Sequence, residues 1–168
     1  DNGTVIQGLT FQNCRANDGG AINLNNCSPL IDQCEFNYNT ADSDGGGIRT
    51  ENCSPTISNC SFDNNTALSG GGVYNNNGSS PLIDQCTFTG NSATTSVPGG
   101  GGGGGMYIND GSSPTISGCD FSQNTSAEGG AGGIDGRDST ITLSNCTLTG
   151  NNTTGAGGGM YMFNCSLE

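Results

Sequence analysis

The amino-acid sequence predicts an all-β protein, a right-handed parallel β-helix (solenoid) with about six rungs of roughly 26 residues and three short strands per rung. Three observations favour this fold class. A cysteine-containing motif recurs along the 168-residue chain. Apolar and polar residues alternate over stretches of three to five residues, as in β-strands with one buried face. The apolar stripe of an amphipathic helix, with its i, i+3, i+4 spacing, is missing from the sequence.

The repeat is defined by columns of residues that keep their mutual spacing while the residues between them change. An apolar residue, usually isoleucine, stands three positions before the repeated cysteine; a phenylalanine or leucine follows two positions after it, and an asparagine five positions after it. The cysteines are Cys34, Cys60, Cys86, Cys119 and Cys146; the phenylalanines are Phe36, Phe62, Phe88 and Phe121; the asparagines are Asn39, Asn65, Asn91, Asn124 and Asn151. Several columns in phase are strong evidence for a repeat architecture.

An opening copy fits the same columns with substitutions, through Ile6, Leu9, Phe11 and Cys14. Each copy also contains a Gly-Gly pair followed by an apolar residue. We therefore expect a single domain over residues 1–168, with rungs at about 1–26, 27–52, 53–78, 79–111, 112–138 and 139–164 and a stub at 165–168.

Each copy supplies three strand-like segments, exemplified by "PTIS", "CSF" and "GGVYN". One coil cannot bury a core alone, but stacked coils pair each strand in parallel with its equivalent one rung away. Parallel crossovers are almost always right-handed, which sets the expected hand. Stacking converts the phenylalanine column into an aromatic stack, the asparagine column into an inward amide ladder, and the cysteine column into buried, mostly free thiols.

Insertions fall between the repeated asparagine and the Gly-Gly pair. The largest is "TTSVPGGGGGGG", from Thr94 to Gly105. Since loops absorb insertions and rigid elements do not, we expect this segment to lie outside the stack.

Two motifs carry a family resemblance. "Phe-x-x-Asn" occurs four times, beginning at Phe36, and "GGAI" occurs at Gly19–Ile22 with related versions later. This pairing resembles the GGA(I/L/V) and FxxN repeats of chlamydial polymorphic outer-membrane proteins and, more broadly, bacterial right-handed β-helix surface proteins. The resemblance covers essentially the whole chain. It implies a secreted or surface-displayed protein that is often adhesive.

Charge and composition exclude several functions. The formal net charge is -12, which disfavours binding to phosphate backbones, so we expect no nucleic-acid partner. No apolar run reaches the roughly 18 residues of a membrane helix, so we expect no membrane span. The chain has no histidine, and therefore no Ser-His-Asp triad.

Glycoside hydrolysis needs carboxylates that face one cleft. Asp32 and Asp84 share an outward column but lie two rungs apart, and Glu35 and Asp120 share the next outward column. Solvated faces are the simpler interpretation of these acids, so we expect that the protein is not an enzyme.

Two candidate sites involve cysteine and aspartate. Cys27 and Cys53 fall on adjacent rungs at a corner, about 5 Å apart at Cα, within the range of a disulfide. Asp18 and Asp44 each precede glycines on consecutive rungs with Asp42 nearby, and together they are a candidate calcium site. Calcium is the one cofactor that the sequence suggests.

Candidate glycosylation sites are the sequon asparagines Asn59, Asn64 and Asn77, which we place at corners where a glycan can project. Neither end of the repeat array carries an atypical polar cap. We therefore expect an extracellular or cell-surface structural or adhesive protein, either a fibre subunit that self-associates end to end or a segment of a longer solenoid. Host or surface glycans are candidate partners. The alternative is a carbohydrate-binding or carbohydrate-cleaving β-helix protein.

Overall fold

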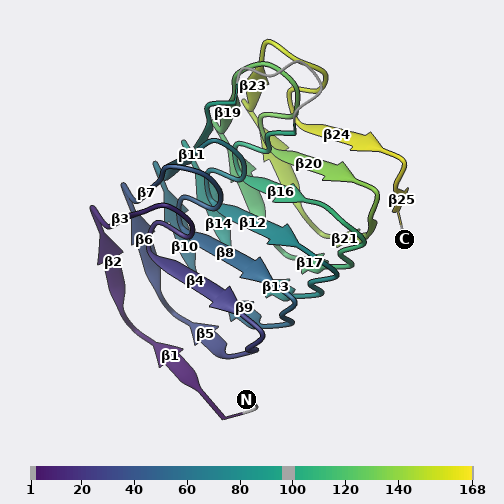
Figure 1. Ribbon diagram of the computed structural model, residues 1–168. Helices are drawn as coiled ribbons and strands as arrows, with labels where there is room; N and C mark the ends of the chain where they lie inside the picture. The colour runs from purple at the N-terminus through teal and green to yellow at the C-terminus, as the bar shows by residue number, and fades with distance from the viewer. Residues whose placement is uncertain (1–2, 96–100, 168) are drawn as a thin grey trace.

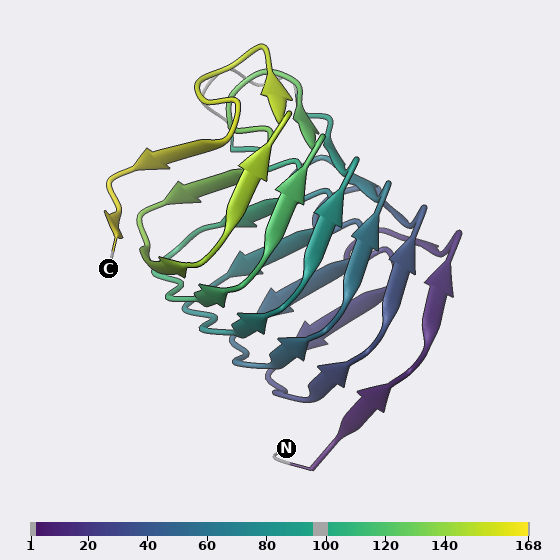
Figure 2. The same cartoon turned by 180° about the vertical axis from the view of Figure 1, so that it is seen from behind.

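The computed structural model describes residues 3–95 and 101–167, which form a parallel β-helix. Its strands are stacked along one axis and lie in four sheets (Figure 1). Figure 2 shows from behind how equivalent strands of successive rungs lie side by side. The all-β parallel solenoid expected from the sequence is therefore confirmed.

The strands are named here by sheet. Sheet A contains β1 (Val5–Gln7), β5 (Leu30–Asp32), β9 (Thr56–Ser58), β13 (Leu82–Asp84), β17 (Thr115–Ser117), β21 (Thr140–Ser144) and β25 (Ser166–Leu167). Sheet B contains β2 (Thr10–Gln12), β6 (Glu35–Asn37), β10 (Ser61–Asp63), β14 (Thr87–Thr89), β18 (Asp120–Ser122) and β22 (Thr147–Thr149). Sheet C contains β3 (Arg15–Ala16), β7 (Thr40–Ala41), β11 (Thr66–Ala67), β15 (Ser92–Ala93), β19 (Thr125–Ser126) and β23 (Asn152–Thr153). Sheet D contains β4 (Ile22–Asn25), β8 (Ile48–Glu51), β12 (Val73–Asn76), β16 (Met106–Ile108), β20 (Ile134–Arg137) and β24 (Met160–Phe163).

Sheets A, B and D are the three strands per rung that the sequence predicts. Sheet C adds a column of two-residue strands immediately after the repeated asparagine. The register follows the sequence columns: Phe36 pairs with Phe62, and Ile57 pairs with Ile83, both in parallel. The copies aligned in the sequence are therefore the rungs of the solenoid.

Residues with positive φ form the corner between sheets A and B. Gln33, Asn59 and Gln85 occupy this corner at φ values of 53°, 52° and 53°, and Gly118 takes it at 60°. Amide side chains tolerate this left-handed conformation better than most, which explains the polar, loop-like character of the repeats.

The core is a continuous apolar column beneath these corners. The rings of Phe36 and Phe62 stack with centroids 4.7 Å apart and planes 5° apart, and those of Phe88 and Phe121 stack at 4.5 Å. These four rings are fully buried. Parallel in-register pairing places each ring in contact with the same column on the rungs above and below. The rings therefore stack as regularly as the strands that carry them.

The expectation that the whole Thr94–Gly105 insertion lies outside the stack is wrong. Residues 96–100 fall outside the described part of the chain, but Gly101–Gly105 are buried. The Gly105 nitrogen donates hydrogen bonds to Gly132 and Gly133, and a Cβ at Gly105 would lie 2.9 Å from the Phe121 ring. Glycine is needed at the end of this run because the backbone there passes too close to the core to leave room for a side chain.

Within the described ranges, no helix is long and apolar enough to cross a membrane.

Candidate functional site

The asparagine ladder is the most regular polar feature of the interior. The Asn65 Nδ2 donates to the Phe36 carbonyl at 2.8 Å and to the Asn91 Oδ1 at 3.0 Å. The Asn65 Oδ1 accepts from both the backbone nitrogen and the Nδ2 of Asn39, at 2.9 and 3.0 Å. The amide satisfies groups that the tight corner would otherwise leave unpaired in an apolar core, so its role is structural.

The cysteine column lies just beneath the corner between sheets A and B. The Cys60 Sγ donates to the Ser58 carbonyl at 3.1 Å and accepts from the Cys34 backbone nitrogen at 3.4 Å. Burial raises the pKa of the Cys34 thiol. A side-chain hydrogen bond with Cys86 is the main reason why the pKa of Cys60 is lowered.

The candidate disulfide between Cys27 and Cys53 is not formed in the described part of the chain, where both residues are free cysteines. They do lie on adjacent rungs, because the Cys27 backbone nitrogen donates to the Cys53 Sγ at 3.3 Å. The Cys53 thiol points instead toward the carbonyl of Glu51, 3.0 Å away.

The three carboxylates of the candidate calcium site do not form one cluster. Asp42 accepts hydrogen bonds from Arg15 at 2.7 and 3.1 Å. Asp18 and Asp44 interact, since burial and the Asp18 charge both raise the pKa of Asp44. In the described part of the chain, no three His, Cys, Asp or Glu residues are grouped so as to hold a metal ion. Both Arg15 hydrogen bonds end on the Oδ1 of Asp42, so this carboxylate is already paired with a cationic side chain.

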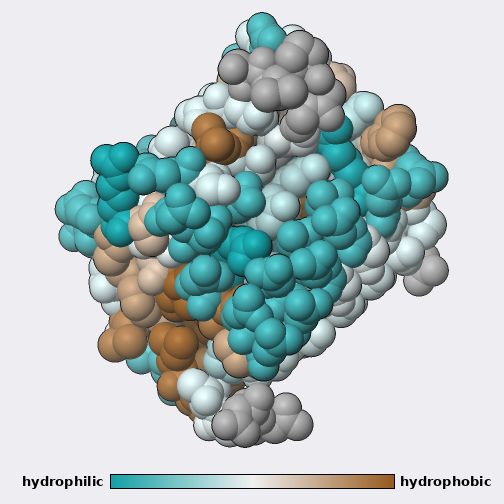
Figure 3. All heavy atoms as spheres, viewed as in Figure 1, coloured by the Kyte–Doolittle hydropathy of each residue, from teal (hydrophilic) through white to brown (hydrophobic). Residues whose placement is uncertain are grey.

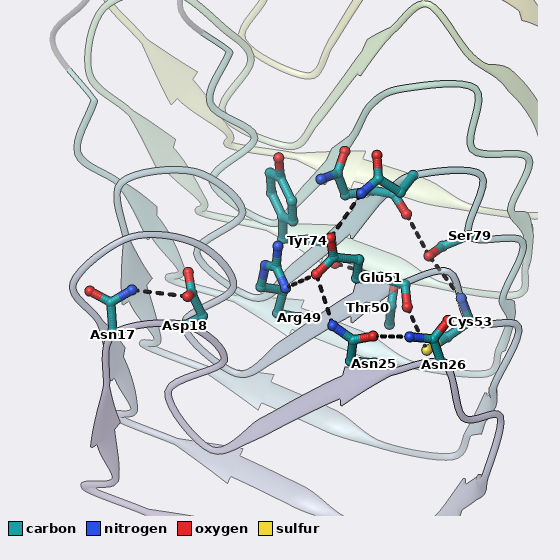
Figure 4. Close-up of polar contacts among 12 residues, drawn as sticks. Asn17, Asp18, Asn25, Asn26, Arg49, Thr50, Glu51, Cys53, Tyr74 and Ser79 are labelled. Atoms are coloured by element: carbon teal, nitrogen blue, oxygen red, sulfur yellow. Dashed lines mark hydrogen bonds and ion pairs between the residues drawn. The ribbon is translucent and has the colours of Figure 1, made fainter.

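A charged network covers one end of the outer face of sheet D (Figure 4). Glu51 accepts hydrogen bonds from Arg49 at 2.7 Å, from Asn77 at 2.8 Å and from Asn25 at 3.2 Å. The Arg49 bond is the main reason why the pKa of Glu51 is lowered. Asn25, Glu51 and Asn77 come from three successive rungs, so the network ties neighbouring rungs together.

A second buried network was not predicted from the sequence. Asp135 is fully buried and accepts from the Gly102 backbone nitrogen at 2.9 Å. It forms an ion pair with Arg137 at 3.3 Å, and Arg137 also donates to the Gly129 carbonyl and lies over the Tyr161 ring. The signal available in the sequence was Asp135 in the outward column of sheet D, where the neighbouring rungs place Tyr107 and Tyr161.

This network anchors the large insertion to the sheet. A Cβ at Gly101 would lie 2.2 Å from the Cζ of Tyr107, so the glycine backbone packs directly against that ring. Burial raises the pKa of Tyr107 to about 12. The residues around Asp135 are therefore best explained as a structural clamp for the loop.

The outward acids Asp32 and Asp84, which were candidates for catalysis, accept hydrogen bonds from neighbouring side chains. Asp32 accepts hydrogen bonds from Gln7, Ser58 and Asn59, and the bond from Asn59 is the main reason for its lowered pKa. Asp84 accepts from Ser117 at 2.5 Å. Ser58 pairs with both Asp32 and Asp84 and separates them in the column.

In the next outward column, Glu35 pairs with Ser61, which pairs with Thr87, and Thr87 pairs with Asp120. Two residues therefore lie between the two acids. This spacing along one sheet face does not set two carboxylates across a bond from each other, as glycoside hydrolysis requires.

The candidate glycosylation residues Asn59, Asn64 and Asn77 are exposed. All three have positive φ, at 52°, 56° and 51°. The side-chain nitrogens of Asn59 and Asn77 donate to Asp32 and Glu51, and glycosylation at the three positions stays a prediction.

No curated protein matches the sequence significantly. A family model described as the right-handed β-helix region matches residues 1–167. The match covers nearly the whole chain and supports the hand expected from the crossovers. This chain belongs to the right-handed β-helix family.

Proposed function

We propose that this chain is a rigid segment of an extracellular or cell-surface structural protein, and that its ends join other β-helix rungs, in a second copy or in more of the same polypeptide. The GGA(I/L/V)-like and FxxN motifs resemble those of chlamydial polymorphic outer-membrane proteins, and this resemblance supports a surface role. Attachment to host or surface glycans is part of this proposal.

The observation that carries the proposal is the contrast between the inside of the stack and its two ends. Phe36 is fully buried, whereas Phe11, in the same column on the first described rung, is partly exposed. Leu148 and Met160, on the last rung, are also only partly buried. Hydrophobic side chains gather at the end formed by β1, β2 and β4, drawn in brown at lower left (Figure 3). Another rung laid on either end would complete the burial that the middle already has.

The backbone at the two ends supports the same proposal. Strands β2 and β22 lie at the two edges of sheet B, and among the described residues each has a hydrogen-bonded neighbour on one side only. Open parallel edges are templates for further strand pairing. The net charge of -12 disfavours sideways clumping but leaves the ends available.

Assembly is tested with a matched pair of variants. The Phe11 ring stacks on Phe36 at 5.1 Å on one side, so Phe11→Arg places a charge in the proposed junction. Tyr38→Arg is the control, because Tyr38 is 56% exposed and lies on the side of the solenoid. Light scattering and electron microscopy of concentrated protein should show end-to-end assemblies for the wild type and for Tyr38→Arg, and their loss in Phe11→Arg.

A monodisperse wild-type monomer under these conditions would rule out self-association of this segment. Staining of intact source cells with an antibody to the segment tests location separately. Reactivity that appears only after permeabilisation would overturn the surface assignment.

A further inference from the structure

The hydrogen bonds of the asparagine ladder have a direction along the solenoid. The Oδ1 of each ladder asparagine accepts from the backbone nitrogen and the Nδ2 of the asparagine one rung earlier, and its own Nδ2 donates to the phenylalanine carbonyl of that earlier rung. At Asn151 the two bonds from Asn124 measure 2.9 Å, and the bond to the Phe121 carbonyl measures 2.7 Å. Each rung is therefore completed by the asparagine of the rung that follows it.

The last rung that the structure describes lacks this completion. The Asn151 backbone nitrogen has no acceptor among the described residues, and the Asn151 Nδ2 has only the Phe121 carbonyl where the earlier asparagines have two acceptors. The Leu148 carbonyl stands in the column of the Phe121 carbonyl and faces the same open side. One amide side chain supplies both an acceptor and a donor, so an asparagine one rung further on would satisfy all of these groups.

The cysteine column repeats the pattern beside the ladder. The Cys119 backbone nitrogen donates to the Cys146 Sγ at 3.4 Å, as the Cys86 nitrogen does to the Cys119 Sγ. Within the described ranges, the Cys146 backbone nitrogen has no such acceptor. The open face of the last described rung thus presents directed donors in two neighbouring columns.

The first rung of the chain does not match this face. It carries Cys14 in the asparagine column and Leu9 in the cysteine column. The Cys14 backbone nitrogen donates to the Asn39 Oδ1 at 3.0 Å, so this rung is complete on its inner side. On its outer side it offers a thiol, which is a weak donor and acceptor, and a leucine side chain, which is neither.

We propose that the open face around Asn151 is a docking surface selective for a β-helix rung with asparagine in the ladder column, and that Cys14 limits how tightly a second copy of this chain can bind there. The inference rests on the proposed joining of ends and adds the residue that sets its strength. Buried donors left unpaired weaken an interface more than missing contact area does. The amide ladder therefore provides specificity, whereas the apolar columns accept any rung of suitable shape.

The docking surface is accessible along most of the rung. Strands β22 and β23 are edge strands of sheets B and C in the described part of the chain. In sheet A, β25 pairs with Thr140 and Ile141 of β21, while Thr142–Ser144 pair with β17 alone. A docked rung can therefore continue sheets A, B and C beside Asn151.

The test measures self-association of the wild type, Cys14→Asn and Cys14→Ala by sedimentation velocity over a range of protein concentrations. Cys14→Asn gives the first rung the amide that the open face requires, so we expect its dissociation constant to be at least tenfold lower than that of the wild type. Cys14→Ala is the matched control, since it removes the thiol without adding an amide, and it should stay within about twofold of the wild type. Adding Asn151→Ala to Cys14→Asn should abolish the gain.

Hydrogen exchange locates the contact. In concentrated Cys14→Asn, the Asn151 backbone amide should exchange at least tenfold more slowly than in dilute protein. Unchanged exchange in an assembled sample would overturn the proposal, as would a gain that survives Asn151→Ala. Asparagine already occupies this column on five rungs, so a Cys14→Asn chain that fails to fold would also contradict it.

The same data separate this inference from the proposed joining of ends. If the wild type assembles and Cys14→Asn binds no more tightly, the role of the ladder is refuted and end-to-end joining stands. If only Cys14→Asn assembles, self-association of the natural segment is refuted and the selectivity of the docking surface is supported. If neither assembles, both are refuted.

Discussion

Two inward-facing columns of this solenoid follow opposite rules. The column beside sheet B repeats one residue, asparagine, from Asn39 to Asn124, and its side chains are fully buried. The inward column of sheet D changes on every rung; its members are Leu24, Thr50, Asn75, Ile108, Gly136 and Met162. Each asparagine of the first column hydrogen-bonds the next rung, whereas the members of the second column mainly fill volume.

The difference shows what repetition is for in a β-helix. A side chain must be repeated where its partner is the same side chain one rung away, because a change breaks two contacts. Where shape alone matters, neighbouring rungs compensate for one another. Asn75 illustrates this freedom: it accepts from Thr50 at 2.8 Å, but its buried Nδ2 has no hydrogen-bond partner among the described residues.

The largest effect should come from the aromatic stack. Phe62→Ala should lower the free energy of unfolding by about 3–5 kcal/mol, since it leaves a cavity with rings above and below. Phe11→Ala, in the same column on an end rung, should lower it by only about 1–2 kcal/mol because that ring is already partly exposed. Urea denaturation of both variants measures the difference, and equal losses would refute the distinction between middle and end.

The next largest effect separates Asn65, in the asparagine column, from Asn75, in the inward column of sheet D. Asn65→Ala should lower the free energy of unfolding by about 1–3 kcal/mol, because it leaves the Asn39 amide groups and the Phe36 carbonyl unpaired. Asn75→Leu should change it by less than about 1 kcal/mol, since the change removes an unsatisfied donor and retains volume. A larger loss at Asn75 than at Asn65 would contradict the proposed rule.

Substitutions at two glycines of the repeat should also differ in their cost to stability. A Cβ at Gly72 would lie 2.5 Å from the Gly105 carbonyl oxygen and 2.9 Å from the Phe88 ring, so Gly72→Ala should cost about 2 kcal/mol. Gly78 has φ of +70° but open space around it, so Gly78→Ala should cost about 1 kcal/mol through backbone strain alone. Thermal unfolding of the two variants, with Gly3→Ala as an unconstrained control, orders these costs.

The smallest effect concerns pH. Burial raises the folded-state pKa of Asp44, so its contribution to stability is present at acidic pH and is lost as pH rises through that pKa. Asp44→Asn should therefore reduce the fall in Tm between acidic and neutral pH. Asp42→Asn is the exposed control. The lowered pKa values of Asp32 and Glu51 act in the opposite sense and reduce stability as pH falls. A Tm profile unchanged by Asp44→Asn would show that this burial has no energetic consequence.

The sequence was sufficient to predict the fold because residues that recur in phase along the chain are the ones that stack on successive rungs. Once Phe36, Phe62 and Phe88 were aligned, parallel pairing and the inward columns followed. The two-residue strands of sheet C were missed because they are too short to show alternation. The clamp around Asp135 was missed because it depends on where an irregular loop returns to the sheet. The calcium prediction placed Asp42 with Asp18 and Asp44, but its pairing with Arg15 is set by side-chain direction, which spacing does not reveal.

The direction of the hydrogen bonds also determines how the molecule bears force. Bonds between rungs run along the solenoid axis, so a pull on the two ends opens them a few at a time, as a zipper opens. Each released rung, such as the 26 residues from Phe36 to Phe62, would add about 90 Å of extended chain. Under load the molecule would therefore lengthen in steps of one rung each, with a longer step for the rung that carries the insertion.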